Sequence, residues 1–135
     1  MYKKVNIAYY LPYDIHIVEA LKALPVPLVT FDNHKVYFDQ DKRYETIYEH
    51  IANKSHHLHL VDIARIPLIL RDKDSLKLDK NGKGFRTYIG LRGKKNESKK
   101  YILITTRVKQ NRKESVVSLF PIKLNYWFIL INQLL

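Results

Sequence analysis

The spacing of apolar residues at the start of the chain predicts a strand and then a helix. The run over Val5–Tyr10 is typical of a short strand. A helix over Asp14–Leu24 follows, because four apolar residues recur there close to the helical period: Ile15, Val18, Leu21 and Leu24. The side chain of Asp14 can cap the start of this helix, and Pro25 and Pro27 end it.

The next segments predict a hairpin and two more helices. Runs rich in β-formers over Leu28–Phe31 and Lys35–Phe38 flank three turn residues. A helix over Arg43–Lys54 is predicted because one of its faces carries four apolar or aromatic residues: Tyr44, Ile47, Tyr48 and Ile51. The segment Val61–Ile66 favours a short helix that ends before Pro67.

The second half of the chain predicts strands. Four segments alternate or run apolar, and short polar turns separate them: Leu76–Asp79, Phe85–Leu91, Lys100–Lys109 and Ser115–Phe120. Strands joined in sequence by short turns form an antiparallel meander. The order of elements therefore predicts an α+β fold, in which N-terminal helices and a hairpin precede a four-stranded antiparallel twisted sheet.

No internal repeat or linker divides the 135 residues into two domains. We expect a single domain with an N-terminal extension over residues 1–42, a core over residues 43–123 and an apolar C-terminal element over residues 124–135. The longest apolar run, Tyr126–Ile131, is far shorter than the roughly 20 residues that a membrane-spanning helix needs. The sequence shows no signal peptide, so we expect a cytoplasmic protein, or an effector delivered by an export system that needs none.

The amount and the location of positive charge are the most informative features of the composition. The chain has 24 Lys and Arg against 13 Asp and Glu, a net charge of +11. Fifteen basic and four acidic residues lie between Arg71 and Lys113, whereas the rest of the chain has nine of each. Apolar and aromatic residues accompany these cations, unlike in a flexible basic tail. Such a segment suits a polyanionic partner, with nucleic acid favoured over an anionic membrane. The alternative is that the lysines simply lie in solvent-exposed loops.

Some classes of chemistry are excluded by the composition. The chain has no cysteine, which rules out a disulfide framework, a thiolate metal site and a cysteine nucleophile. Its four glycines do not form a Walker or dinucleotide-binding loop, and the Gly-x-Ser-x-Gly motif of a serine nucleophile is missing. We expect no cofactor.

Histidines cluster just before the predicted sheet: His50, His56, His57 and His59. A metal could use His57 with His59, or His50 with that pair, together with Asp62, but this spacing matches no metal motif and we predict no metal site. Imidazoles also suit proton transfer near neutral pH. The third interpretation is that these are polar residues at a helix end, where histidine interacts favourably with the helix dipole.

Alternate residues of a strand share a face, so the strands can gather basic and aromatic residues on one side. We predict that Arg86, Tyr88, Arg107 and Lys109 share such a face, although each alone could be a solvated strand residue. A base could stack on Tyr88 or on an arginine plane while the cations contact the backbone. Two lysines in the loop between these strands are further candidates for substrate binding: Lys94 and Lys95.

A helix with a histidine at or after its end precedes an apolar segment with a proline. Four strands follow, with basic or aromatic residues on the second and third, and a hydroxyl residue stands near an aromatic-proline pair. The segments concerned are Ile47–Ile51 with His57, Ile66–Asp72, Phe85–Tyr88, Lys100–Ile104 and Val116–Pro121. In this order they resemble the barnase–EndoU–colicin–RelE superfamily of metal-independent nucleases, and within it the phage-associated subfamilies. The first 40 residues match nothing in it, and Ser118 stands where the family often has threonine.

The resemblance implies a barnase-like fold and cleavage of RNA without metal. The ribose 2′-OH would attack the adjacent phosphate, which needs a base, an acid and cations for the phosphorane. His57 would be the base or acid, with His50 as the other candidate. Arg86 and Arg107 would bind the phosphorane, and Ser118 would contact the phosphate or orient a histidine.

We therefore predict a metal-independent endoribonuclease, a phage or mobile-element effector or a toxin, that acts on RNA rather than DNA. A toxin would imply an acidic immunity or antitoxin protein that covers the basic surface. One alternative is a binding module of the same fold without catalysis, whose affinity for RNA or DNA would fall steeply with salt. The other is a structural protein whose apolar C-terminus docks a partner.

Overall fold

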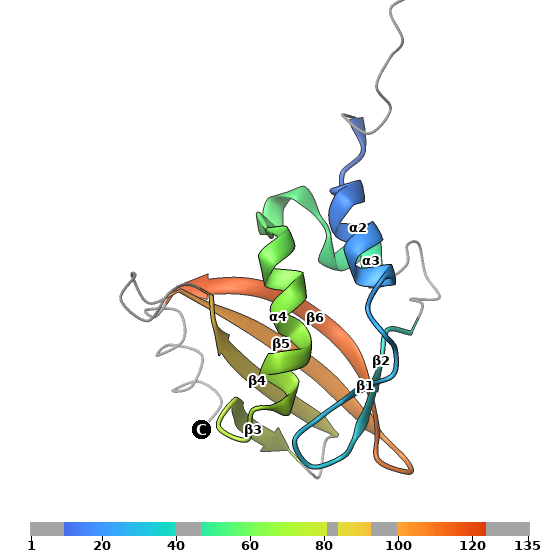
Figure 1. Ribbon diagram of the computed structural model, residues 1–135, viewed down its shortest axis with the longest axis vertical. Coiled ribbons are helices and arrows are strands. Elements are labelled where there is room, and N and C mark those ends of the chain that lie inside the picture. Colours follow the sequence, from blue (N-terminus) through green and yellow to red (C-terminus); the bar gives the residue numbers. More distant parts are fainter. Residues whose placement is uncertain (1–9, 40–46, 81–83, 93–99, 124–135) are drawn as a thin grey trace, which may run out of the picture.

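The fold belongs to the predicted α+β class (Figure 1). Its strands form one mixed sheet. The structure is a computed structural model that describes residues 10–39, 47–80, 84–92 and 100–123. The helices are α2 (Ile15–Lys22), α3 (Ile47–Ile51) and α4 (Leu60–Arg71), with a 3-10 turn over Lys54–His56. The strands are β1 (Leu28–Val29), β2 (Lys35–Tyr37), β3 (Leu76–Lys80), β4 (Phe85–Leu91), β5 (Lys100–Lys109) and β6 (Lys113–Lys123).

The sheet is larger than predicted. Strands β3 to β6 form the expected antiparallel meander. The β1–β2 hairpin, however, joins the same sheet, because β2 pairs in parallel with β6 and gives the order β1-β2-β6-β5-β4-β3. The backbone N–H of Lys35 donates to the carbonyl of Arg112 at 2.8 Å where this pairing starts. The prediction of a four-stranded antiparallel sheet is therefore wrong, since the edge of β6 is paired by a strand from the N-terminal third.

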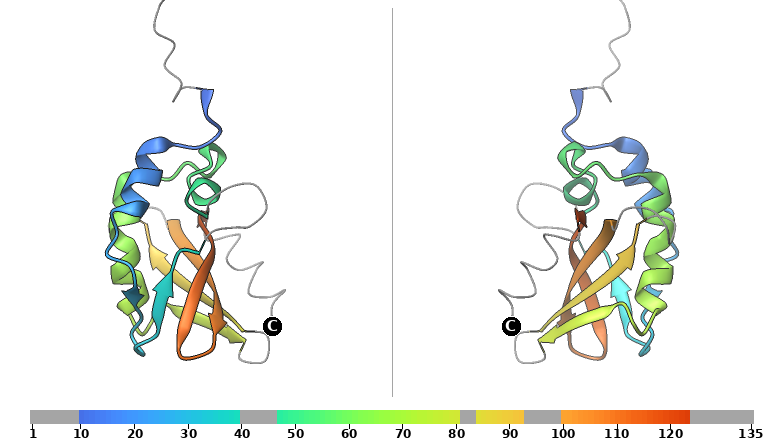
Figure 2. Two further views of the ribbon diagram at one scale, coloured as in Figure 1. Left: turned by 90° about the vertical axis from the view of Figure 1, so that its right-hand side faces the viewer. Right: turned by 90° about the vertical axis from the view of Figure 1, so that its left-hand side faces the viewer.

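Helix α2 forms where the sequence predicted it. The carboxylate of Asp14 accepts a hydrogen bond from the backbone N–H of His16 at 2.9 Å and so caps the first turn. The apolar stripe Ile17, Val18 and Leu21 is buried, and α2 packs against α4. In the side views, α2 and α4 lie together on one side of the sheet (Figure 2).

Helix α4 is longer than predicted and continues through Pro67 to Arg71. Proline removes one backbone donor and crowds the preceding turn, so the sequence favoured an end at Ile66. Tertiary contacts outweigh this cost, because Ile69 and Leu70 beyond the proline are buried under the sheet. The carbonyl of Leu70 also accepts a hydrogen bond from the N–H of Phe31, at 2.9 Å.

Parts of several predicted elements lie outside the described residues. These are the strand predicted over Val5–Tyr10 apart from its last residue, the first four residues of the helix predicted over Arg43–Lys54, and the apolar C-terminal element. The described part of that helix is α3, after which the chain tightens into the 3-10 turn. Among the described residues, no helix is long and apolar enough to cross a membrane.

The main core lies between the sheet and the helices. Its residues include Leu21 of α2, Val36 of β2, Ile66 of α4 and Ile104 of β5, so the N-terminal third and the meander share one core. We call the sheet face that lies against α4 the inner face and the opposite one the outer face. A smaller apolar cluster occupies the outer face: Ile89, Leu103 and Ile122, with Tyr101 and Phe120 packed against it.

A β-bulge changes which residues of β6 point inward. Thr106 pairs with Val116 and Thr105 with Ser118, so Val117 is left as an extra residue. Val116 therefore shares the inner face with Leu119, whereas Ser118 and Phe120 face outward. Strict alternation along this strand would have placed Val116 and Ser118 on the same side.

Candidate functional site

The strand register separates the four residues that were predicted to share a face. Arg86 lies opposite Thr106 and Tyr88 opposite Ile104, which places both side chains on the inner face. Arg107 lies opposite Phe85, so Arg107 and Lys109 point outward. The prediction of one common face is therefore wrong. Arg86 is 2% exposed and Tyr88 is fully buried, and neither presents a surface on which a base could stack.

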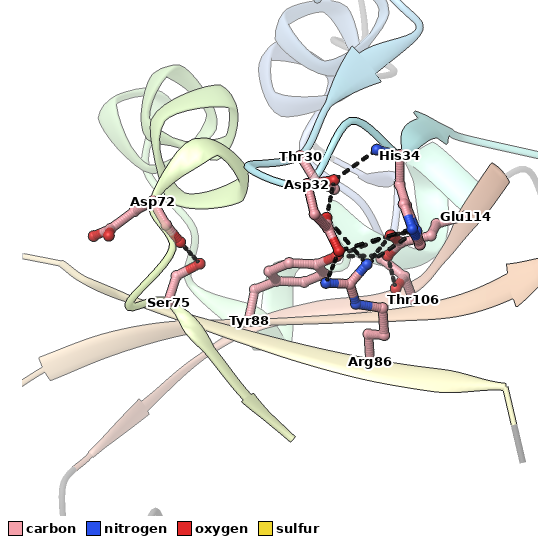
Figure 3. Close-up of polar contacts among 9 residues, drawn as sticks. All are labelled: Thr30, Asp32, His34, Asp72, Ser75, Arg86, Tyr88, Thr106 and Glu114. Atoms are coloured by element: carbon pink, nitrogen blue, oxygen red, sulfur yellow. Dashed lines mark hydrogen bonds and ion pairs between the residues drawn. The ribbon is translucent and has the colours of Figure 1, made fainter. Parts of the chain in front are cut away.

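The inner-face residues converge on the carboxylate of Glu114, which is fully buried (Figure 3). Tyr88 donates its hydroxyl to this carboxylate at 2.7 Å, and the hydroxyl of Thr106 donates at 2.6 Å. The Nη1 of Arg86 donates to Oε2 at 2.9 Å. A buried carboxylate requires such a set of donors, because isolated burial of a charge costs far more than one hydrogen bond returns.

The β1–β2 turn completes this cluster. Asp32 accepts from Arg86 with both carboxylate oxygens, at 2.8 and 3.3 Å. The hydroxyl of Thr30 donates to Asp32 at 2.6 Å and accepts from the backbone N–H of His34 at 2.9 Å, which fixes the turn. The Nδ1 of His34 lies 2.8 Å from Glu114. The guanidinium of Arg86 therefore joins two carboxylates that are far apart in the sequence.

The electrostatics follow from this packing. Burial and the hydrogen bond to Glu114 both raise the pKa of the Tyr88 hydroxyl, so it stays protonated and can donate. Burial also raises the pKa of Asp32, but hydrogen bonds from Thr30 and Arg86 and the charges of Arg86 and His34 lower it by more. Burial acts to lower the pKa of Arg86, and its carboxylate partners raise it overall.

Three of these side chains could together contact a metal ion. One ligand atom each of Asp32, His34 and Glu114 lies within 4.8 Å of the others. The Nη1 of Arg86 already approaches all three, at 3.3, 2.9 and 2.9 Å. A guanidinium thus occupies the place of the cation, and the donor set fits an internal ion-pair cluster better than a metal centre.

His57, the predicted acid or base, lies at the other end of β4 from Arg86. Its side chain is exposed, and its backbone adopts the left-handed conformation, with φ of 52°. Its carbonyl accepts a hydrogen bond from Nη2 of Arg92 at 2.7 Å. Arg92 follows Arg86 by six residues, about 20 Å at the rise of a strand. His57 and Arg86 therefore do not meet in one site.

Arg92 itself belongs to a second buried ion pair. Its Nη2 lies 3.1 Å from Asp62, whose carboxylate is fully buried in the first turn of α4. Asp62 also accepts the backbone N–H of His59 at 2.7 Å. This pair attaches the start of α4 to the end of β4 and positions the chain from His57 to His59.

His57 lines a surface pocket of about 230 Å³. Three buried apolar residues and five polar ones line this pocket, and we call them its floor and its rim: Ile17, Ala52 and Leu58, then Asp14, Asn53, Lys54, His57 and His59. Two imidazoles and one ammonium group at a single pocket could bind an anion or transfer a proton. Of the predicted site residues that the structure describes, only His57 lines it.

The other predicted residues lie elsewhere. His50 is exposed at the end of α3, and its ring lies 6.1 Å from that of His56. The His56 ring lies 6.5 Å from Phe120 of β6. Ser118 is half-buried on the outer face, next to Thr105. Lys94 and Lys95 lie outside the described residues.

The outer face carries a group of cations and aromatic residues at the end near the β5–β6 turn. One cross-strand row contains Lys80, Phe85, Arg107, Ser115 and Tyr37. The next row contains Lys109, Lys113 and Lys35. We call these eight residues the outer strip. Within the described part of the chain, Lys109 pairs with Asp39 at 3.0 Å, and the other four cations form no ion pair.

Sequence reasoning missed Asp32, His34 and Glu114 as partners of Arg86. The first two were interpreted as turn residues, and Glu114 directly follows the basic segment that ends at Lys113. One signal was present. Glu114 alternates with Val116 toward the apolar side of β6, and a charged residue in an apolar stripe implies a buried partner.

The comparisons with known proteins give no relative. No family model matches the chain, and no curated protein or solved structure is significantly similar to it.

Proposed function

We propose that this protein binds single-stranded nucleic acid, RNA before DNA, through the outer strip. The observation that carries the proposal is that five cations and two aromatic side chains share one end of one sheet face. The inner-face arginine and tyrosine that the sequence favoured do not contribute, because they are buried in the Glu114 cluster.

The composition of the strip suits a flexible polyanion. Lysine and arginine side chains contact phosphates, and an aromatic ring on a sheet surface can stack with a base of any sequence. Phe85 is 38% exposed, and Arg107 lies beside it on the neighbouring strand. Adjacent strands are about 4.8 Å apart, so phosphate and base contacts can alternate across the sheet.

A charge-matched pair of variants tests this proposal. K35A/R107A/K113A removes three strip cations, and K22A/R71A/K73A removes three exposed cations elsewhere. Binding of a fluorescein-labelled single-stranded RNA is measured by anisotropy at one fixed ionic strength. We expect the strip variant to lose most of its affinity, because phosphate contacts dominate such binding, and the matched variant to stay close to the wild type. Equal losses in the two variants would reduce the effect to net charge and contradict the proposal.

The aromatic contribution is tested at Phe85. F85A and F85L should both bind about tenfold more weakly, since stacking on one base contributes roughly 1–3 kcal/mol, while F85Y should retain binding. If F85L binds as well as the wild type, the side chain provides apolar area rather than stacking.

RNA cleavage without metal is the second candidate function. One observation favours it: the exposed imidazole of His57 lines the same pocket as Lys54, so an acid–base group and a cation lie together. This arrangement differs from the predicted one, because Arg86 and Ser118 are not part of it. A nuclease of this kind would be a toxin or effector, and an acidic immunity protein would complement the outer strip.

An RNA-cleavage assay distinguishes catalysis from binding. Labelled RNA is incubated with the full chain in EDTA, and the products are compared with those of H57A and of H16A, an exposed histidine that does not line the pocket. Cyclic-phosphate products that disappear only in H57A would support the candidate. Equal cleavage by H57A and wild type would remove His57 from the mechanism. If the RNA stays intact but is still bound, cleavage is ruled out and the binding function is the one supported.

A further inference from the structure

The rim of the pocket beside His57 contains two acceptor side chains, one ammonium group and two imidazoles. The Oδ1 of Asp14 accepts from the backbone of His16 at 2.9 Å. The Oδ1 of Asn53 accepts from Ser55, from its N–H at 2.9 Å and its hydroxyl at 2.7 Å. The carboxylate and the amide oxygen therefore serve to cap local turns.

Three rim side chains can contact an anion. Lys54, His57 and His59 supply an ammonium group and two imidazoles around one opening. Within the described part of the chain, the imidazole of His57 makes no hydrogen bond, although its carbonyl is bonded to Arg92. Lysine binds phosphate as a point charge, and imidazole N–H groups add directed donors. We propose that this pocket binds a phosphate monoester.

The apolar floor of the pocket indicates that the ligand carries an organic group beside its phosphate. Ile17, Ala52 and Leu58 are buried core residues, and their side chains form the apolar base. Small-molecule sites combine an apolar lining with a few convergent polar groups in this way. Inorganic phosphate alone would make no apolar contact in the pocket, so a ligand with a flat aromatic group, such as a nucleoside monophosphate, should bind more tightly.

The backbone at His57 is held in place for this role. A non-glycine residue in the left-handed region stores strain that the surroundings must offset. Here the surroundings are Arg92, which binds the His57 carbonyl, and buried Asp62, which binds both Arg92 and the N–H of His59. The two imidazoles are thus attached to one rigid ion pair at the start of α4 rather than to a free loop.

The phosphate could belong to a free nucleotide or to the 5′ end of an RNA strand, and the site is independent of the outer strip in either case. The test follows the histidine side-chain resonances of the full chain by NMR, at constant ionic strength, while inorganic phosphate or adenosine monophosphate is added. We expect saturable shifts of His57 and His59, with no shift of His34 at the other end of the sheet. The nucleotide should saturate at lower concentration than inorganic phosphate.

Variants then test which residues bind the phosphate and whether it comes from a free nucleotide or from an RNA end. K54M and H57Q should each weaken phosphate binding about tenfold, as expected for loss of one charged hydrogen bond. The strip variant K35A/R107A/K113A should bind phosphate as the wild type does, which separates this site from the proposed function. In that variant, an RNA with a 5′-phosphate should shift His57 where the 5′-hydroxyl form does not, if the strand end is the ligand.

Two results would overturn the proposal. One is a linear, non-saturating shift of every histidine, which reports ionic environment only. The other is unchanged phosphate affinity in K54M and H57Q while circular dichroism shows that both variants are folded.

Discussion

At the scale of single residues, the carboxylate of Glu114 determines what its neighbours can do. Arg86 and Tyr88 have the composition of a nucleic-acid contact, but both side chains turn inward toward this buried acceptor. Of the fifteen basic residues between Arg71 and Lys113, Arg86 and Arg92 each form an ion pair inside the fold. A charge count locates a basic segment correctly and cannot distinguish cations on the surface from cations in the core.

Removal of Glu114 should strongly destabilise the fold. E114A would leave Arg86 buried beside Tyr88 and Thr106 with the central acceptor gone, and breaking a buried ion pair costs about 3–5 kcal/mol. E19A, on the exposed side of α2, should change the free energy of unfolding by less than about 0.5 kcal/mol. Urea denaturation followed by circular dichroism measures both. An E114A midpoint equal to that of E19A would show that the cluster contributes nothing to stability.

The cluster should also make the free energy of unfolding depend on pH in the acidic range. The folded-state pKa of Asp32 lies below its unfolded value, so its carboxylate stabilises the fold above about pH 4. This contribution is lost as the pH falls through that value toward the lower folded-state pKa. D32N should therefore lose less stability than the wild type between about pH 6 and about pH 3. D74N, whose side chain forms no ion pair among the described residues, should follow the wild type, and an identical acid response of D32N would contradict the assignment.

At the scale of elements, the spacing of apolar residues predicted most helices and strands. It did not predict where they end or which sheet face their side chains occupy. The pattern could not show that α4 continues past Pro67, because that depends on the burial of Ile69 and Leu70 against a sheet formed later in the chain. The bulge at Val117 likewise arises from pairing with β5. Such features depend on contacts between distant segments, which one local sequence window does not contain.

Gly90 shows how closely α4 approaches the sheet. A Cβ atom at this position would lie 2.3 and 2.4 Å from two side-chain carbons of Ile69. G90A should destabilise the fold by about 1–3 kcal/mol, the usual cost of overpacking. I69A removes the clashing atoms, so the double variant should be more stable than the sum of the two single changes predicts.

A double-mutant cycle measured by urea denaturation gives this coupling. Additive effects in G90A/I69A would mean that the helix shifts away from the sheet and that the contact does not fix the position of α4.

At the scale of the whole molecule, the two sheet faces have different roles. The inner face combines the apolar core with the Glu114 cluster, and the outer face carries the outer strip at one end and an apolar cluster at the other. The pocket beside His57 lies at the far end of β4 from the strip. The sequence located the cations and the histidines, whereas only the register shows that they belong to separate surfaces.

The salt dependence of RNA binding tests this division for the molecule as a whole. Each phosphate neutralised on a single strand contributes about −0.7 to the slope of log affinity against log salt concentration. If Lys35, Arg107 and Lys113 each contact one phosphate, K35A/R107A/K113A should reduce the magnitude of the slope by about 2 between about 50 and about 200 mM salt. K22A/R71A/K73A carries the same net charge and should keep the wild-type slope, because its missing cations lie off the strip. A parallel reduction in both variants would mean that RNA responds to the total charge of +11 and not to a defined surface.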